Sequence, residues 1–127
     1  MVRTAVVPCF PPAAGLPGLG TLGFESFWRR FRAEAAPAMW LGVVLAAALV
    51  QVTPIVTVGR PALAGWLSAA TLERHLQRLL ASRVYLVRQS IFLLKMVGGL
   101  CWAAHPEIRA RIGLDPYPGD PGTWRSA

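Results

Sequence analysis

The sequence predicts an all-α protein, a single compact bundle of about five helices with extended, Pro/Gly-rich termini. Apolar residues recur at helical spacing in each long segment between residues 24 and 112. Prolines and glycines separate these segments, and the length of 127 residues suits one domain. We therefore divide the chain into a flexible N-terminal segment (1–23), a helical domain (24–114) and an extended C-terminal tail (115–127).

The composition limits the class of function. Hydrophobic residues make up 54% of the chain and charged residues only 15%, so another protein or a membrane should cover part of the surface. The net charge is +7, but its basic residues are scattered, which argues against nucleic acid and favours an acidic protein face or an anionic membrane surface. Cys9 and Cys101 lack the spacing of a disulfide framework or a metal site, which favours a reducing, cytoplasmic location.

The N-terminal residues 1–23 are punctuated by Pro and Gly, so we expect them to be extended or disordered. The apolar run at residues 4–7 is too short for the centre of a secretory signal, and we predict no cleavable signal peptide.

The first helix is predicted at residues 24–35, where Phe24, Phe27, Trp28 and Phe31 fall at i, i+3, i+4 and i+7. Two interpretations are open. The aromatic face packs on the domain core, or the helix lies on a membrane surface with its arginines in the headgroup region.

The second helix is predicted at residues 38–52, within a stretch from 35 to 59 that contains no charged residue. Pro37 and Pro54 limit its length to about 24 Å, which is shorter than a hydrocarbon core of about 30 Å. Basic residues flank both sides, so no charge asymmetry selects an orientation. We therefore expect a buried central helix, with a single membrane span as the alternative.

The third helix is predicted at residues 69–81, with Ser68 as its N-cap and His75 on its polar side. The fourth, at 84–104, is apolar nearly all round, so we expect it to be buried nearly all round with Leu94 in the core. Arg88 and Lys95 lie seven residues apart and form one narrow polar stripe on it.

Two details complete the helical prediction. The pair Gly98–Gly99 permits close approach of another backbone to the fourth helix. A fifth helix is predicted at 106–112, with Pro106 at its first position, Glu107 in its first turn and a left-handed Gly113 after its end. His105 is expected to cap this helix or face solvent rather than act in catalysis.

No catalytic, cofactor-binding or metal-binding residue is predicted. The six carboxylates are dispersed, and neither a phosphate loop nor a GxGxxG motif is present. Exposed aromatic and basic side chains are instead the candidates for binding a partner. The predicted partner-binding residues are Phe24, Phe27, Trp28, Arg88, Lys95, Tyr117 and Trp124.

A family resemblance rests on several short motifs. They are GRP at 59–61, Leu-Ser at 67–68, ERxLxRLLAS at 73–82, the long helix with Arg88 and Lys95, and PEIRARIGL from residue 106. Residues 24–114 thus resemble small helical accessory subunits and N-terminal modules of FAD-dependent glucose-methanol-choline (GMC) type oxidoreductases. These include long-chain alcohol oxidase-like enzymes and, more distantly, gluconate 2-dehydrogenase subunit 3.

The resemblance implies a non-catalytic accessory subunit that binds and stabilises an FAD-dependent oxidoreductase, with the FAD held by that partner. The chain departs from the family at His105, where Asp would be a better N-cap, and in lacking a twin-arginine leader. The alternative is a small membrane-associated or single-span protein that acts as an anchor through residues 24–34 and 35–59.

Overall fold

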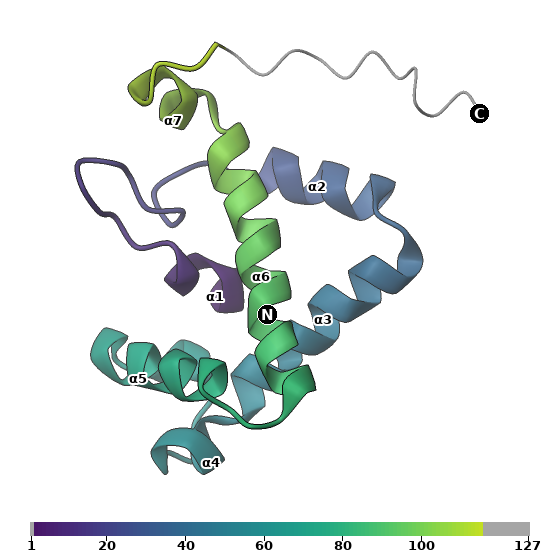
Figure 1. Cartoon of the computed structure of the whole chain (residues 1–127), viewed down its shortest axis with the longest axis vertical. Coiled ribbons are helices and arrows are strands. Elements are labelled where there is room, and N and C mark those ends of the chain that lie inside the picture. The colour runs from purple at the N-terminus through teal and green to yellow at the C-terminus, as the bar shows by residue number, and fades with distance from the viewer. Residues whose placement is uncertain (1, 116–127) are drawn as a thin grey trace.

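The computed structural model describes residues 2–115, and its architecture within that range is all-helical, as predicted (Figure 1). Seven α-helices and two short 3-10 helices follow one another, and no named strand occurs among these residues. In chain order the elements are α1 (Val2–Val6), η1 (Val7–Cys9), α2 (Glu25–Glu34), α3 (Pro37–Val52), α4 (Pro54–Val58), η2 (Ala64–Trp66), α5 (Ala69–Leu80), α6 (Tyr85–Ala104) and α7 (Pro106–Arg111). The five predicted helices correspond to α2, α3, α5, α6 and α7.

Helix α6 is the axis of the domain, and α1, α3, α5 and α7 all pack against it (Figure 1). Its buried side chains interlock with those of α3, which crosses it. Leu94 and Val97 of α6 and Val43 and Val50 of α3 are each 0% exposed. The predicted core position of Leu94 is therefore confirmed.

Proline and glycine set the helix boundaries. Pro37, Pro54 and Pro106 each stand in the first turn of a helix, where the missing N–H leaves no hydrogen bond unmade. Gly113 is left-handed, with φ 70°, as predicted, and so is Gly59 after α4. Pro54 was expected only to end α3, but it also begins α4.

The two predicted N-caps differ in outcome. The ring of His105 accepts a hydrogen bond from the backbone N–H of Glu107 at 3.3 Å, so its capping role is confirmed. Ser68 stands at the N-cap position of α5 as predicted, but its hydroxyl accepts no capping hydrogen bond and donates to Oγ1 of Thr71 at 2.9 Å.

The N-terminal segment is part of the core, so the prediction of an extended segment was wrong for residues 2–9. Helix α1 packs against α3 and α6, and Val6 and Leu19 are each only 1% exposed. The indole N–H of Trp102 on α6 donates to the Pro17 carbonyl at 2.9 Å, which ties the following loop down. Apolar side chains between the prolines and glycines bury enough area to order this segment.

The close approach predicted at Gly98 occurs, but to side chains. A Cβ at Gly98 would lie 2.6 Å from Cε2 of Phe10 and 2.7 Å from Cγ1 of Val6, both distances too short for real atoms. Glycine at this position therefore makes the seat on α6 into which the N-terminal segment fits.

Two polar side chains are buried among these helices, and both join elements distant in sequence. Gln51 on α3 donates to the Thr4 hydroxyl at 2.8 Å and accepts from the Gly65 N–H at 3.2 Å, linking α1, α3 and η2. His75 on α5 is 0% exposed, and its Nε2 lies 2.9 Å from the Val50 carbonyl. The prediction that His75 lies on the polar side of its helix was wrong.

Candidate interaction surface

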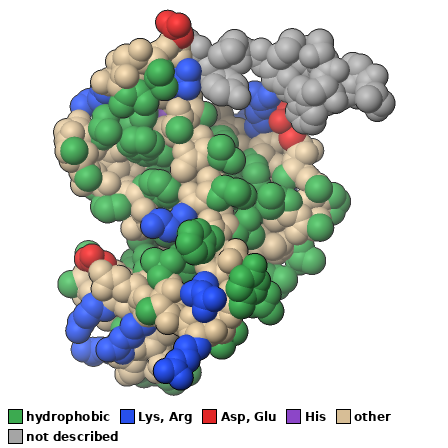
Figure 2. Space-filling model, in the orientation of Figure 1, with side chains coloured by type: hydrophobic (Ala, Val, Ile, Leu, Met, Phe, Trp, Pro, Cys, Tyr) green, Lys and Arg blue, Asp and Glu red, His purple; other side chains and the backbone are tan. Residues whose placement is uncertain are grey.

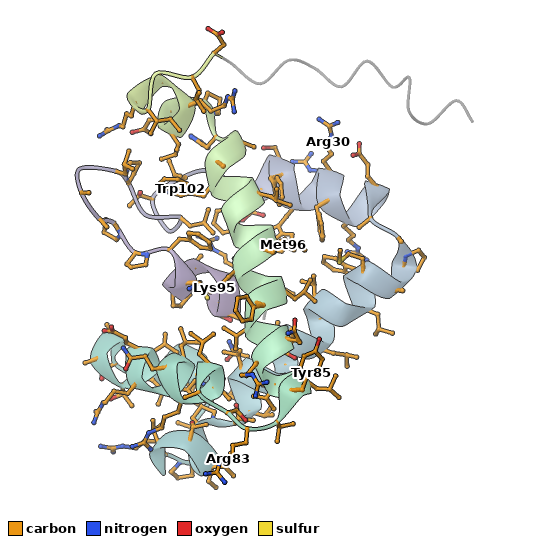
Figure 3. All side chains as sticks on the ribbon, viewed as in Figure 1. Arg30, Arg83, Tyr85, Lys95, Met96 and Trp102 are labelled. Carbon is orange, nitrogen blue, oxygen red and sulfur yellow. The ribbon has the colours of Figure 1, made fainter. Side chains whose placement is uncertain are left out.

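Helix α6 has one covered side and one open side, so the prediction that it is buried nearly all round was wrong. Ile91, Leu94, Val97 and Cys101 face the core, where α1, α3 and α5 lie. Phe92, Met96 and Leu100 recur every four residues on another side and are 58%, 48% and 56% exposed. Figure 3 shows Met96 on the open side of α6, and Figure 2 shows the hydrophobic side chains that gather there.

Helix α3 repeats this arrangement. Ala46 and Ala47 pack inward at 2% and 0% exposure, whereas Leu41, Leu45 and Val52 are 56%, 60% and 62% exposed. A buried central helix was expected, and that prediction is correct for one side only. We call the six open side chains on the two packed helices the α3–α6 apolar stripes: Leu41, Leu45, Val52, Phe92, Met96 and Leu100.

An apolar groove continues from the C-terminal end of α3. It has a volume of about 280 Å³ and is wide open to solvent. Trp66 forms one wall and is 78% exposed, although no sequence pattern marked it as a candidate. The groove is lined by Val52, Ile55, Pro61, Ala62, Leu63 and Trp66.

The two predicted basic residues of α6 have different environments. Lys95 is exposed beside the open stripe of α6. Arg88 is half-buried, donates from Nη1 to the Ser82 carbonyl at 2.6 Å and lies 6.0 Å from the centre of the Tyr85 ring. Of the pair, Lys95 is thus the side chain more available to a partner's carboxylate.

The aromatic candidates of the first helix are more enclosed than expected. Phe24 precedes α2 and is 3% exposed, so it belongs to the core and its assignment as a partner contact was wrong. Phe27 and Trp28 are half-buried and pack with Phe31; the Trp28 ring also meets Trp40 of α3 edge-on at 6.1 Å. This packing supports the interpretation in which the aromatic face of α2 covers the domain. Tyr117 and Trp124 lie outside the described residues.

The ionisable groups inside the domain are kept neutral by burial. Desolvation lowers the pKa of His75, and the Val50 carbonyl partly opposes this shift. Burial raises the pKa of the Cys101 thiol to about 11, and it also raises that of Cys9, with the Lys95 charge partly opposing it. Between residues 2 and 115 no three His, Cys, Asp or Glu side chains gather closely enough to hold a metal ion.

Helix α6 also has the length and composition of a membrane span. It is 20 residues long with a mean hydropathy of 1.3, and 28% of this stretch is buried within the domain. The core helix of a soluble protein meets the same two criteria, so the feature is weak evidence of membrane insertion.

Sequence reasoning identified both helices but not which side of each stays open, because apolar residues occupy all sides. The positions of small residues indicate which side of each helix is covered. Gly98 and Cys101 on α6, and Ala46 and Ala47 on α3, mark the sides where other elements approach closely. The large side chains Phe92 and Leu45 stand on the sides left open.

Comparisons of the chain with protein-family models, with curated proteins and with solved structures found no match. The resemblance of residues 24–114 to accessory subunits of GMC-type oxidoreductases therefore stays a prediction that rests on the motifs quoted above.

Proposed function

We propose that this chain is a non-catalytic small subunit that binds and stabilises an FAD-dependent GMC-type oxidoreductase. The observation that carries the proposal is the pair of α3–α6 apolar stripes, whose six side chains are each 48–62% exposed. Exposed apolar side chains that recur along one side of a helix are typical of a site that another molecule covers. Burial of these side chains in a complex would supply the driving force for assembly.

Two motifs of the family resemblance belong to helices that pack against α6. The ERxLxRLLAS motif forms most of α5 and the turn after it, and PEIRARIGL forms α7 and the Gly113 that follows it. Both helices pack directly against α6. The resemblance thus describes the scaffold that holds the open stripe of α6, while the FAD and the redox chemistry belong to the partner.

Charge beside the stripes supports a partner with an acidic rim. Lys95 stands between Phe92 and Met96 in sequence, and it is exposed. A carboxylate on the partner would meet this ammonium at the edge of an apolar contact, where such pairs raise the rate of association more than the affinity.

A second candidate, a single-span membrane anchor, is favoured by the length and hydropathy of α6. Insertion of α6 would separate Leu94 and Val97 from α3 and would place Lys95 near the middle of the span. The core packing of α6 therefore favours the subunit over the anchor.

The test is capture of the oxidoreductase from the native host by the tagged full chain, with flavin absorbance and mass determination of the captured protein. We expect Met96→Glu with Leu100→Glu to weaken the complex by roughly 2 kcal/mol or more, about thirtyfold. Ile112→Glu is the matched control, because Ile112 is 47% exposed but lies at the end of α7.

Charge reversal at Arg88 and Lys95 should slow association and reduce its dependence on salt. Capture of no flavoprotein, or equal capture by all these variants, would contradict the proposal. Recovery of the chain only in carbonate-washed membranes, with the oxidoreductase co-expressed, would decide for the anchor.

A further inference from the structure

The beginning of α6, directly after the turn from α5, exposes three consecutive apolar residues. Val84, Tyr85 and Leu86 are 58%, 62% and 72% exposed, and the first buried residue of α6 is Ile91. We call Arg83–Leu86 the α5–α6 tip. Figure 3 places Arg83 and Tyr85 at the end of the molecule opposite α7, away from Met96 and the middle of α6.

Basic residues surround this tip with little acidic charge nearby. Arg78 lies in the last turn of α5, Arg83 precedes the apolar triplet, and Arg88 follows it. Between residues 35 and 106 the chain has six basic residues and one acidic residue, Glu73, a balance of 6 − 1 = +5. Figure 2 shows the blue side chains gathered at the same end of the molecule.

We propose that the α5–α6 tip docks on the surface of an anionic phospholipid bilayer. Val84, Tyr85 and Leu86 enter the boundary between headgroups and acyl chains, and Arg83 lies against the lipid phosphates. A tyrosine ring is suited to this depth because its body is apolar and its hydroxyl stays in the headgroup layer. The arginines add attraction to negatively charged lipid.

The geometry of the triplet favours a bilayer over a protein face. Tyr85 and Leu86 begin α6 and point about 100° apart, and Val84 precedes them in an extended conformation, so the three side chains do not lie along one side of the helix. A flat protein surface would contact one or two of them, whereas fluid lipid surrounds all three. The α3–α6 apolar stripes, with their residues on one side of each helix, have the arrangement that suits a protein partner.

This docking is independent of the proposed oxidoreductase partner, since it uses a different surface. It also differs from a membrane span, because α6 keeps its place in the core. The domain would rest on the bilayer by one end, and the apolar stripes would stay accessible to a second protein.

The experiment is flotation of the full chain with phosphatidylcholine vesicles, with and without phosphatidylglycerol, at low and at physiological salt. We expect binding only where phosphatidylglycerol is present, and weaker binding at higher salt. Val84→Ser with Tyr85→Ser and Leu86→Ser should lower partitioning roughly tenfold or more. Arg83→Glu should lower it roughly fivefold.

Two controls match these variants. Arg29→Glu makes the same charge change at an exposed position of α2. Leu41→Ser with Leu45→Ser and Leu100→Ser removes three side chains that are 56–60% exposed on the apolar stripes. Both controls should bind vesicles within about twofold of the unchanged chain, and circular dichroism should show the same helix content for all variants.

Absence of binding to anionic vesicles would overturn the proposal. So would an equal loss in Arg29→Glu, which would show attraction by net charge alone, or an equal loss in the stripe variant. If the tip variants lose capture of the oxidoreductase while the unchanged chain binds no vesicles, the tip is a protein interface and the lipid proposal fails. Normal capture with no vesicle binding would leave the proposed function standing and remove the lipid docking alone.

Discussion

The N-terminal segment and the open side of α6 use apolar side chains in opposite ways. Residues 2–24 alternate apolar residues with Pro and Gly, yet Val6, Leu19 and Phe24 are at most 3% exposed. Helix α6 is far richer in apolar residues, yet Leu100 is 56% exposed. Burial here depends on whether a matching surface lies opposite, and not on how apolar a segment is.

Close packing explains the difference. The N-terminal segment is seated where Gly98 removes the side chain of α6, so Val6 and Phe10 approach the helix backbone. On the open side, Phe92 and Met96 project from α6 and no described element reaches over them. The segment completes the core, while the open side is left for another molecule.

The largest expected effect separates the two sides of α6. Leu94→Asp places a charge where the side chain is 0% exposed, at a cost of several kcal/mol against a total stability of about 5–15 kcal/mol. We expect this variant to be unfolded in circular dichroism. Leu100→Asp, on the open side, should change the free energy of unfolding by less than about 0.5 kcal/mol in a urea titration. Similar losses in both variants would show that the open side is covered within the domain.

The next effect tests the seat of the N-terminal segment. Gly98→Ala would bring a Cβ to 2.7 Å from Val6, a stiff buried side chain that cannot turn away. We expect it to destabilise the domain by about 1–3 kcal/mol and to expose the segment to limited proteolysis. At Gly99 the nearest atom is Cζ of Phe10 at 3.5 Å, an ordinary contact. Gly99→Ala should therefore be neutral or stabilising by up to about 1 kcal/mol.

The smallest expected effect is the pH dependence of stability that comes from the buried His75 and Cys101. His75 joins α5 to α3 and α4, and its folded pKa lies below the ordinary 6.5. The unfolded chain therefore binds a proton first as the pH falls, and stability should decrease below pH 6.5 by at most about 1.4 kcal/mol per pH unit. Cys101, with a folded pKa of about 11 against 9.0, should make stability fall as pH rises between these values.

Urea titrations across the pH range would measure both slopes. His75→Gln should remove the acid slope, and Cys101→Ala should reduce the alkaline slope, to which the raised pKa of Cys9 also contributes. If the free energy of unfolding of His75→Gln still decreased at low pH, the decrease would come from the carboxylates instead.

Local signals predicted the long helices well. The observed bounds Pro37–Val52, Ala69–Leu80 and Tyr85–Ala104 lie within one residue of the predicted ranges. Helical periodicity and the conformational limits of Pro and Gly act within one or two turns, so sequence alone is enough to place these elements.

The features that were not predicted from the sequence depend on contacts between residues that are distant in the chain. Helix α1 has only five residues and is held by α3 and α6, which no local pattern reveals. His75 gave a usable signal, since it lies three residues after Leu72 and four before Leu79, within the apolar stripe of α5. Because histidine is a polar residue, it was assigned to the polar side of the helix in spite of this spacing.

The candidate site was predicted less completely than the fold. Arg88 and Lys95 were placed on α6, but Phe24 proved to be a core residue, and the open stripe was not distinguished from the buried one. A helix that has apolar residues on all sides can pack against the rest of the domain in several equivalent ways. The choice is made by partner elements and by small residues such as Gly98.

The seat at Gly98 also fixes an order of events during protein synthesis. Val6 is synthesised before the part of α6 on which it packs, because Gly98 follows it 92 residues later in the chain. At roughly 5–20 residues per second, about 5–20 s pass between the two. During that interval α1 has no helix to dock on, and the core can close only after α6 has been made.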